Sequence, residues 1–133
     1  MTRWVQRFEN FEKAHANFKD TINCIEQEGL NKIYTMALIQ AYEIVFELAW
    51  KTLKDYLEYN GIKTETPRET IKESFQKNII NNGQIWIEMM EARNKTSHTY
   101  REEFAQQLVS EILNNYTSLL DELQVYLKGK ING

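Results

Sequence analysis

Residues 3–28 read RWVQRFENFEKAHANFKDTINCIEQE, and the spacing of their large side chains decides the fold. These side chains recur alternately four and three residues apart, which is the stripe of an amphipathic helix about seven turns long. They are Trp4, Phe8, Phe11, His15, Phe18, Ile22 and Ile25. We predict one helix from about residue 3 to about residue 28, ended by Gly29. His15 should be a core or half-buried histidine with one hydrogen bond, the alternative being a partner for the motif discussed below.

A second long helix is predicted from about Lys32 to Tyr59, before the turn-forming pair Asn60-Gly61. One stripe comprises Tyr34, Leu38, Ala41, Val45, Leu48, Thr52 and Tyr56, and it is widened by Met36, Ile39, Phe46, Trp50, Leu53 and Leu57. A helix that is apolar around so much of its circumference contacts several neighbours or a second chain. Glu43, Glu47 and Lys51 are spaced by four on the remaining edge, and we interpret Glu47 and Lys51 as a solvated ion pair.

A short third helix has a clear start signal in Thr66-Pro67-Arg68-Glu69. Thr66 suits the N-cap, Pro67 the first helical position, and Glu69 the other half of a capping box. The helix should run to about Lys77, with Ile71 and Phe75 facing inward. Asn81-Asn82-Gly83 then interrupts the chain.

The fourth helix starts near Gln84, and its apolar face comprises Ile85, Trp86, Met89 and Met90. The fifth begins at residues 101–103 and runs to about Lys128, where Gly129 should stop it. Its stripe is Phe104, Leu108, Ile112, Tyr116, Leu119, Leu120, Leu123 and Leu127. We therefore predict an all-α fold, an antiparallel up-and-down four-helix bundle in which the third helix is an additional short segment. Nothing marks a second domain, so residues 1–133 should form one.

The composition of the 133-residue chain limits the function classes. Hydrophobic residues make up 42% and charged residues 26%, as in globular proteins. No apolar run approaches the ~20 residues of a membrane span, the N-terminus has no signal-peptide core, and Cys24 is alone. These features favour the cytoplasm. The net charge of −3 argues against a protein that coats nucleic acid.

Residues 93–101, RNKTSHTYR, gather chemistry that a helical bundle does not need. Arg93 continues the apolar face of the fourth helix, where an arginine is costly unless it is paired. Asn94 and His98 would share a face of a continuous helix, whereas Arg93 and His98 would point about 140° apart. They can flank one groove if the helix bends or ends among Thr96, Ser97 and Thr99. Alternatively, a two-fold dimer supplies Arg93 from one chain and His98 from the other.

This set of groups fits RNA cleavage without a metal. His98 can act as base or acid, Arg93 can hold the charged phosphate oxygens, and Asn94 can orient the histidine or bind a phosphate oxygen. The competing interpretation is that Arg93 caps a helix C-terminus and His98 belongs to an exposed loop. The sequence contains no metal-ligand cluster, phosphate-binding glycine loop or nucleophilic triad, so we expect neither a metal nor a cofactor.

The motif resembles the Arg-x4-His-x-Tyr signature of the HEPN superfamily, in its HepT-like branch. It is carried by Arg93-Asn94-x3-His98 with Thr99-Tyr100. The flanks, YEIVFELAWKTLKDYL at 42–57, Thr66-Pro67-Arg68-Glu69 and Ile85-Trp86, are similar to the nucleotidyltransferase substrate-binding proteins of that superfamily. The resemblance covers the chain from about Phe8 to Leu127.

The resemblance implies a bundle that dimerises with the motif at the dimer cleft, beside a separately encoded minimal nucleotidyltransferase. In HepT-like systems the HEPN chain is a toxin ribonuclease, and the transferase neutralises it by adding adenylate to the motif tyrosine. Arg93 and His98 would then be catalytic, Asn94 supporting, and Tyr100 the modified phenol. We expect Lys95, Ser97 and Arg101 to contact the substrate. The alternative is a non-catalytic subunit that binds a nucleotide or other substrate and presents it to the transferase, and a third is a plain helical dimerisation module.

Overall fold

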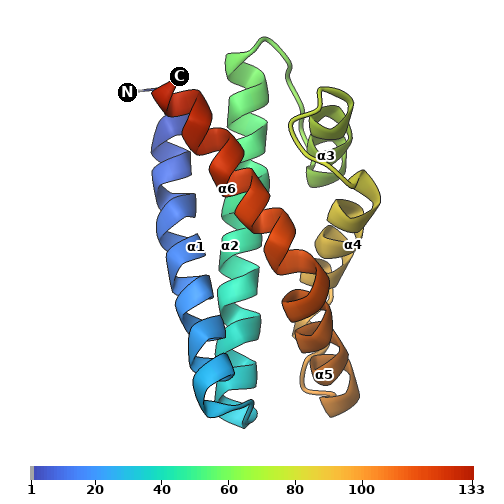
Figure 1. Ribbon diagram of the computed structural model, residues 1–133. Coiled ribbons are helices and arrows are strands. Elements are labelled where there is room, and N and C mark those ends of the chain that lie inside the picture. The colour runs from blue at the N-terminus through green and yellow to red at the C-terminus, as the bar shows by residue number, and fades with distance from the viewer. Residues whose placement is uncertain (1) are drawn as a thin grey trace.

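The computed structural model describes residues 2–133, and within them the chain forms helices and no strand. Helices α1 (Arg3–Glu28) and α2 (Lys32–Tyr59) pack antiparallel along their length, and α6 (Thr117–Asn132) crosses them obliquely (Figure 1). The helices α3 (Pro67–Gln76), α4 (Gly83–Asn94) and α5 (Glu102–Glu111) lie on the other side of α2. Helix α2 contacts α1, α3, α4 and α5, as its wide apolar surface predicted. The all-α helical bundle is confirmed.

The two long helices have the predicted bounds. Every apolar member of the α1 stripe is buried, and Gly29 ends the helix with φ of +87°. Asn31 caps α2 through its side-chain oxygen, which accepts a hydrogen bond from the Tyr34 backbone N–H at 2.8 Å. At the far end of α2, Gly61 takes φ of +85°, which a residue with a side chain rarely adopts.

Helix α3 confirms the predicted N-cap but corrects the prediction for Phe75. The Thr66 hydroxyl accepts a hydrogen bond from the Glu69 N–H at 3.1 Å, and Ile71 is buried. Phe75, however, is 50% exposed. Its ring lies over Gly83, where an added Cβ would stand 2.9 Å from the Phe75 Cγ. The ring therefore covers the start of α4 instead of entering the core, and Ser74 takes the buried position.

The predicted fifth helix is interrupted by a π-helical segment, η2 (Ile112–Tyr116), between α5 and α6. The Thr117 hydroxyl donates to the Ile112 carbonyl at 2.7 Å within this widened turn. Such turns bend helices, and this one lets α5 pack on α2 while α6 packs on α1. Gly129 does not stop α6, which continues to Asn132. A glycine in the last turn costs a helix only about 1 kcal/mol, which does not force it to end.

An aromatic cluster joins α2 to α4 and η2, and it positions the end of α4. The rings of Tyr42 and Tyr116 stack with centroids 5.7 Å apart, and Phe46 packs on Trp86. The Tyr42 hydroxyl donates to the Met89 carbonyl at 2.7 Å, one turn before Arg93. Within residues 2–133, no helix combines the length and the apolar character needed to cross a membrane.

Candidate active site

The motif lies at the corner between α4 and α5. Helix α4 ends at Asn94, and Thr96–His98 forms a single 3₁₀ turn, η1. The Thr96 hydroxyl donates to the Arg93 carbonyl at 2.9 Å, and the Thr99 hydroxyl donates to the Thr96 carbonyl at 2.7 Å. The Thr96 hydroxyl thus bonds a carbonyl in the last turn of α4, and the Thr99 hydroxyl closes the 3₁₀ turn that follows. The predicted helix end is confirmed, so the face that Asn94 and His98 would share on a straight helix does not form.

Arg93 is half-buried and faces α2, where two carboxylates receive it. Its Nη1 lies 3.7 Å from Glu43 Oε2, and its Nε lies 3.4 Å from Glu47 Oε1. Its side chain is 29% exposed, and its buried Nε makes no hydrogen bond of good geometry within residues 2–133. The arginine is thus paired, as its position required, and only the exposed part of its guanidinium can still face an anion.

The phenol of Tyr42 lies in the field of the same arginine. Burial raises the pKa of Tyr42 well above its usual range, Tyr116 raises it further, and the Arg93 charge opposes both effects. Tyr42 therefore stays a neutral hydrogen-bond donor behind the site, and its bond to Met89 fixes the turn that carries Arg93.

The other predicted site residues are open to solvent. Tyr100 is 75% exposed, and its ring centroid lies 6.4 Å from that of His98. The Arg101 guanidinium lies over the Tyr100 ring at 5.8 Å. The remaining members, Asn94, Lys95 and Ser97, are also exposed. The corner thus brings together His98, Tyr100 and Arg101, while Arg93 turns to α2, and no hydrogen bond joins it to His98 within residues 2–133.

Comparison with known families identifies the chain. The family model for nucleotidyltransferase substrate binding protein like chains matches residues 6–129. The chain belongs to this family. A curated relative, the Probable ribonuclease HepT of Haemophilus influenzae, is 30% identical over 94 residues. That match covers 65% of this chain and 64% of the relative, so slightly less than two thirds of the relative's length is spanned.

Two solved structures share the fold of this family member. A Haemophilus influenzae structure, described as revealing the fold of a substrate binding domain of a nucleotidyltransferase, superposes with a TM-score of 0.81 at 22% identity. The superposition covers 91% of this chain and 98% of the Haemophilus influenzae chain. A crystal structure from Thermus thermophilus gives a TM-score of 0.75 at 28% identity, covering 85% and 94% of the two chains.

Sequence reasoning missed the carboxylates that hold Arg93. The predicted ion pair of Glu47 with Lys51 is confirmed, at 3.8 Å, but Glu47 also faces Arg93, which the sequence did not reveal. A signal was available. Glu43 and Glu47 lie one turn apart on the edge that the wide apolar surface of α2 leaves. A half-buried arginine on another helix requires a carboxylate partner, and these two were available.

His15 takes no part in the motif of this family member. Its Nε2 lies 2.7 Å from Asp121 Oδ1, and its ring stacks on Phe11. Lys19 donates to the other Asp121 oxygen at 2.8 Å. The prediction of a core or half-buried histidine with one hydrogen bond is confirmed, and the bond joins α1 to α6.

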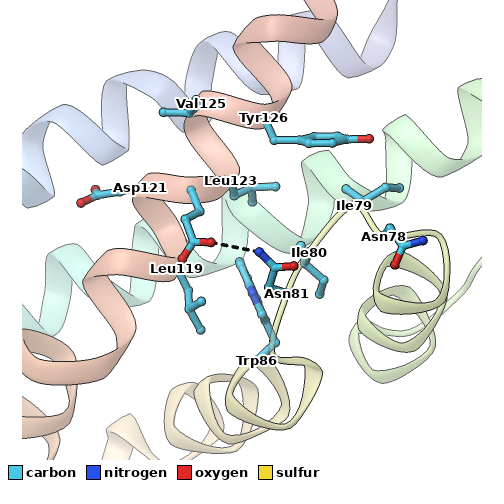
Figure 2. Close-up of a pocket in the computed structure, with 11 residues that line it drawn as sticks. Asn78, Ile79, Ile80, Asn81, Trp86, Leu119, Asp121, Leu123, Val125 and Tyr126 are labelled. Carbon is cyan, nitrogen blue, oxygen red and sulfur yellow. Dashed lines mark hydrogen bonds between the residues drawn. The ribbon is translucent and has the colours of Figure 1, made fainter.

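A separate hollow of about 480 Å³ lies between α6 and the connection from α3 to α4 (Figure 2). Asn81 crosses it and donates to Glu122 at 3.1 Å, and the rings of Trp86 and Tyr126 lie on either side of that bond (Figure 2). Its lining is Asn78, Ile79, Ile80, Asn81, Trp86, Leu119, Asp121, Glu122, Leu123, Val125 and Tyr126. None of the predicted site residues belongs to it. Its carboxylates disfavour phosphate, and its size suits a small neutral or cationic ligand.

Proposed function

We propose that this chain is a metal-independent endoribonuclease of HEPN type, acting as the toxin of a two-component system with a minimal nucleotidyltransferase. Residues 1–133 would act as one HEPN-like domain. The observation that carries the proposal is Arg93, which the fold holds half-buried against the carboxylates of Glu43 and Glu47, at the end of α4 that leads into the exposed turn of His98. Phosphate chemistry requires a fixed cation and an accessible imidazole, and the end of α4 and the turn after it would supply one of each.

The reaction would be an attack of a ribose 2′-hydroxyl on the adjacent phosphorus. The base removes the 2′ proton, the new O–P bond forms, and the 5′-oxygen leaves with a proton from the acid. The products are a 2′,3′-cyclic phosphate and a 5′-hydroxyl. His98 supplies one of the two proton transfers, Arg93 binds the phosphorane oxygens, and Asn94 supports them. Lys95, Ser97 and Arg101, all exposed at the same corner, would contact the RNA.

Two proton transfers need two such groups, and a homodimer would bring the second histidine. The surface of α2 supports this assembly, because Ile33, Met36 and Ile44 are all exposed on it. A shallow apolar hollow beside Ile44 continues the same surface toward α1. Glu43 lies on the neighbouring face of α2, so a second copy docked there would come close to Arg93.

Tyr100 would be the residue that the transferase modifies. Its exposed phenol can reach the α-phosphorus of ATP bound by a partner. The phenolic oxygen would form the new O–P bond, pyrophosphate would leave, and the phenolic proton would pass to solvent. Adenylate on Tyr100 would place a negative charge beside His98, whose ring is 6.4 Å away, and so block RNA.

The test is RNA cleavage by the purified chain, in the presence of EDTA, together with growth on expression. We expect Arg93→Ala and His98→Ala to lower cleavage by about 100- to 1,000-fold and to relieve growth arrest. Arg68→Ala on α3, an exposed arginine far along the chain from the motif, is the matched control and should cleave normally. Absence of cleavage and of arrest with the folded wild-type chain would refute the ribonuclease proposal. Mass analysis of Tyr100 after incubation with transferase and ATP tests the modification.

The second candidate is a non-catalytic subunit that binds a substrate for the transferase, and the hollow in Figure 2 favours it. Its aromatic walls suit a planar or ring-shaped ligand, and Asn81 supplies a polar contact. Adenosine and simple amino sugars are the probes, with binding followed by ring signals of Tyr126 in NMR spectra. Tyr126→Ala should abolish binding if this candidate holds, whereas His98→Ala should leave it unchanged.

A further inference from the structure

A second groove, which we call the acidic groove, adjoins the motif. It has a volume of about 410 Å³ and lies between one face of α4 and one face of α5, with the end of η2 at its base. Glu88 and Glu91 line it from α4, and Glu111 lines it from α5. Lys95 belongs both to the lining of the groove and to the motif at residues 93–101.

The carboxylates of the acidic groove have no cationic partner within residues 2–133. Glu111 accepts a hydrogen bond only from the neutral Asn115 side chain, at 2.9 Å. With Lys95 as the lone cation in the lining, the groove carries three negative charges against one positive charge. This charge repels the backbone of RNA. The three carboxylates also do not converge as a metal site would require, since no such cluster is found in residues 2–133.

Tyr116 gives an independent sign that the acidic groove takes a ligand. The side chain is only 5% exposed, lines the groove, and its hydroxyl has no hydrogen-bond partner among residues 2–133. Burial, together with the charges of Glu111, Glu88 and Glu91, raises the pKa of this phenol to about 12. The hydroxyl therefore lies in the field of all three carboxylates and remains neutral. The ring is thus buried while the unpaired hydroxyl reaches the open groove, where a ligand could donate to it or accept from it.

The apolar part of the acidic groove suits the stem of a long basic side chain. Phe104 and Leu108 of α5 and Ala92 of α4 provide hydrocarbon surface beside the carboxylates. Arginine and lysine bury their methylene stems on such surface while their charged heads reach polar groups. A guanidinium can also donate to the Tyr116 oxygen and lie over the Phe104 ring.

We propose that the acidic groove is the docking site for an arginine- or lysine-bearing segment of the nucleotidyltransferase partner. This inference rests on the proposed function, in which that partner works on Tyr100. Lys95 lines the groove and Tyr100 follows five residues later, after a single turn. A protein that carries ATP to Tyr100 must cover this corner, and a basic segment in the groove would hold it there without occupying the exposed His98.

The test measures the affinity of the full chain for a minimal nucleotidyltransferase from the same organism, by calorimetry at two salt concentrations. In the groove variant, Glu88→Gln, Glu91→Gln and Glu111→Gln are combined. The matched control combines Glu9→Gln, Asp20→Asn and Glu26→Gln, which removes the same charge from exposed positions of α1. A third variant, Tyr116→Phe, keeps the ring on Tyr42 and removes only the hydroxyl. Circular dichroism verifies that each variant is folded.

We expect the groove variant to bind at least about 10-fold more weakly, with a flatter salt dependence, and Tyr116→Phe about 3-fold more weakly. The control should stay within about 2-fold of the wild type. Equal affinity of the groove variant and the wild type would overturn the groove inference while leaving the partnership intact. Loss of self-association instead, seen by light scattering, would assign the groove to a second copy and overturn it too. Absence of any complex with the wild-type chain would refute the partnership itself, and the groove inference with it.

Discussion

Tyr42→Phe tests how α2 fixes the end of α4 that carries Arg93. The Tyr42 hydroxyl donates to the Met89 carbonyl at 2.7 Å, and its ring is fully buried against Phe46 and Tyr116. The substitution removes one hydroxyl and leaves the ring in place. It separates the hydrogen bond from the packing of the same side chain.

The expected loss follows from what remains after the hydroxyl is removed. Met89 lies inside α4, so its carbonyl keeps the helical bond from the Arg93 N–H and is not left unsatisfied. The loss is then that of one buried hydrogen bond, about 1 kcal/mol of the free energy of unfolding, or about 4 °C in Tm for a chain of this size. Tyr42→Ala, which also empties the space of the ring, should cost about 3–5 kcal/mol.

Urea unfolding followed by circular dichroism measures both variants. We expect the midpoint for Tyr42→Phe to fall with no change in the slope, because the surface exposed on unfolding is the same. Hydrogen exchange at the Arg93 amide should also speed up, since that amide lies where α4 loses its tether. A loss below about 0.3 kcal/mol, with unchanged exchange at Arg93, would show that the bond does not hold α4 and would refute the reasoning.

Three further predictions concern the fold. Thr66→Ala should lower the free energy of unfolding by about 1 kcal/mol in the same urea assay, because the Glu69 N–H loses its cap, whereas Thr66→Ser should not. Gly83→Ala should lower the free energy of unfolding by about 1 kcal/mol, because the added methyl group presses on the Phe75 ring. In a Phe75→Ala background the same substitution should be neutral or stabilising. Burial raises the pKa values of Tyr42 and Tyr116, the latter to about 12, so the stability they contribute is complete below the unfolded pKa of about 10. It should be lost as the pH rises toward 12, and absorbance titration of tyrosine ionisation together with urea midpoints at pH 9 and 11 would check this.

The helices and most of the core were predictable because periodicity alone determines them. In α1 the four-and-three spacing leaves one arrangement that buries Trp4, Phe8 and Phe11 together, and the structure has it. The start of α3 was equally clear, since Thr66 and Pro67 act within a single turn. The corner at residues 95–99 was anticipated from poor helix formers, and the Thr96 and Thr99 hydroxyls show why the helix ends there.

What the sequence did not reveal depends on contacts between distant segments. Phe75 has the spacing of a core residue, but the bare backbone of Gly83 offers its ring another surface. The π-helical turn at Ile112–Tyr116 leaves the apolar stripe intact, so periodicity gives no sign of it. Glu47 is one turn from Lys51 and 46 residues from Arg93, and only the fold reveals the second pairing.

The position of Arg93 explains how one corner can combine a fixed cation with an exposed turn. Glu43 and Glu47 belong to α2, the helix that contacts most of the bundle. Their carboxylates therefore hold the Arg93 guanidinium in place against the core of the fold. The same two carboxylates oppose any incoming phosphate, which must compete for the guanidinium at a cost that salt screening reduces. Within residues 2–133, His98 has no such anchor and lies on a single turn. The fold thus holds Arg93, which would bind the phosphate charge, against α2, and it places His98, which would transfer protons, on the exposed turn. A second chain or a bound RNA could still orient His98 there.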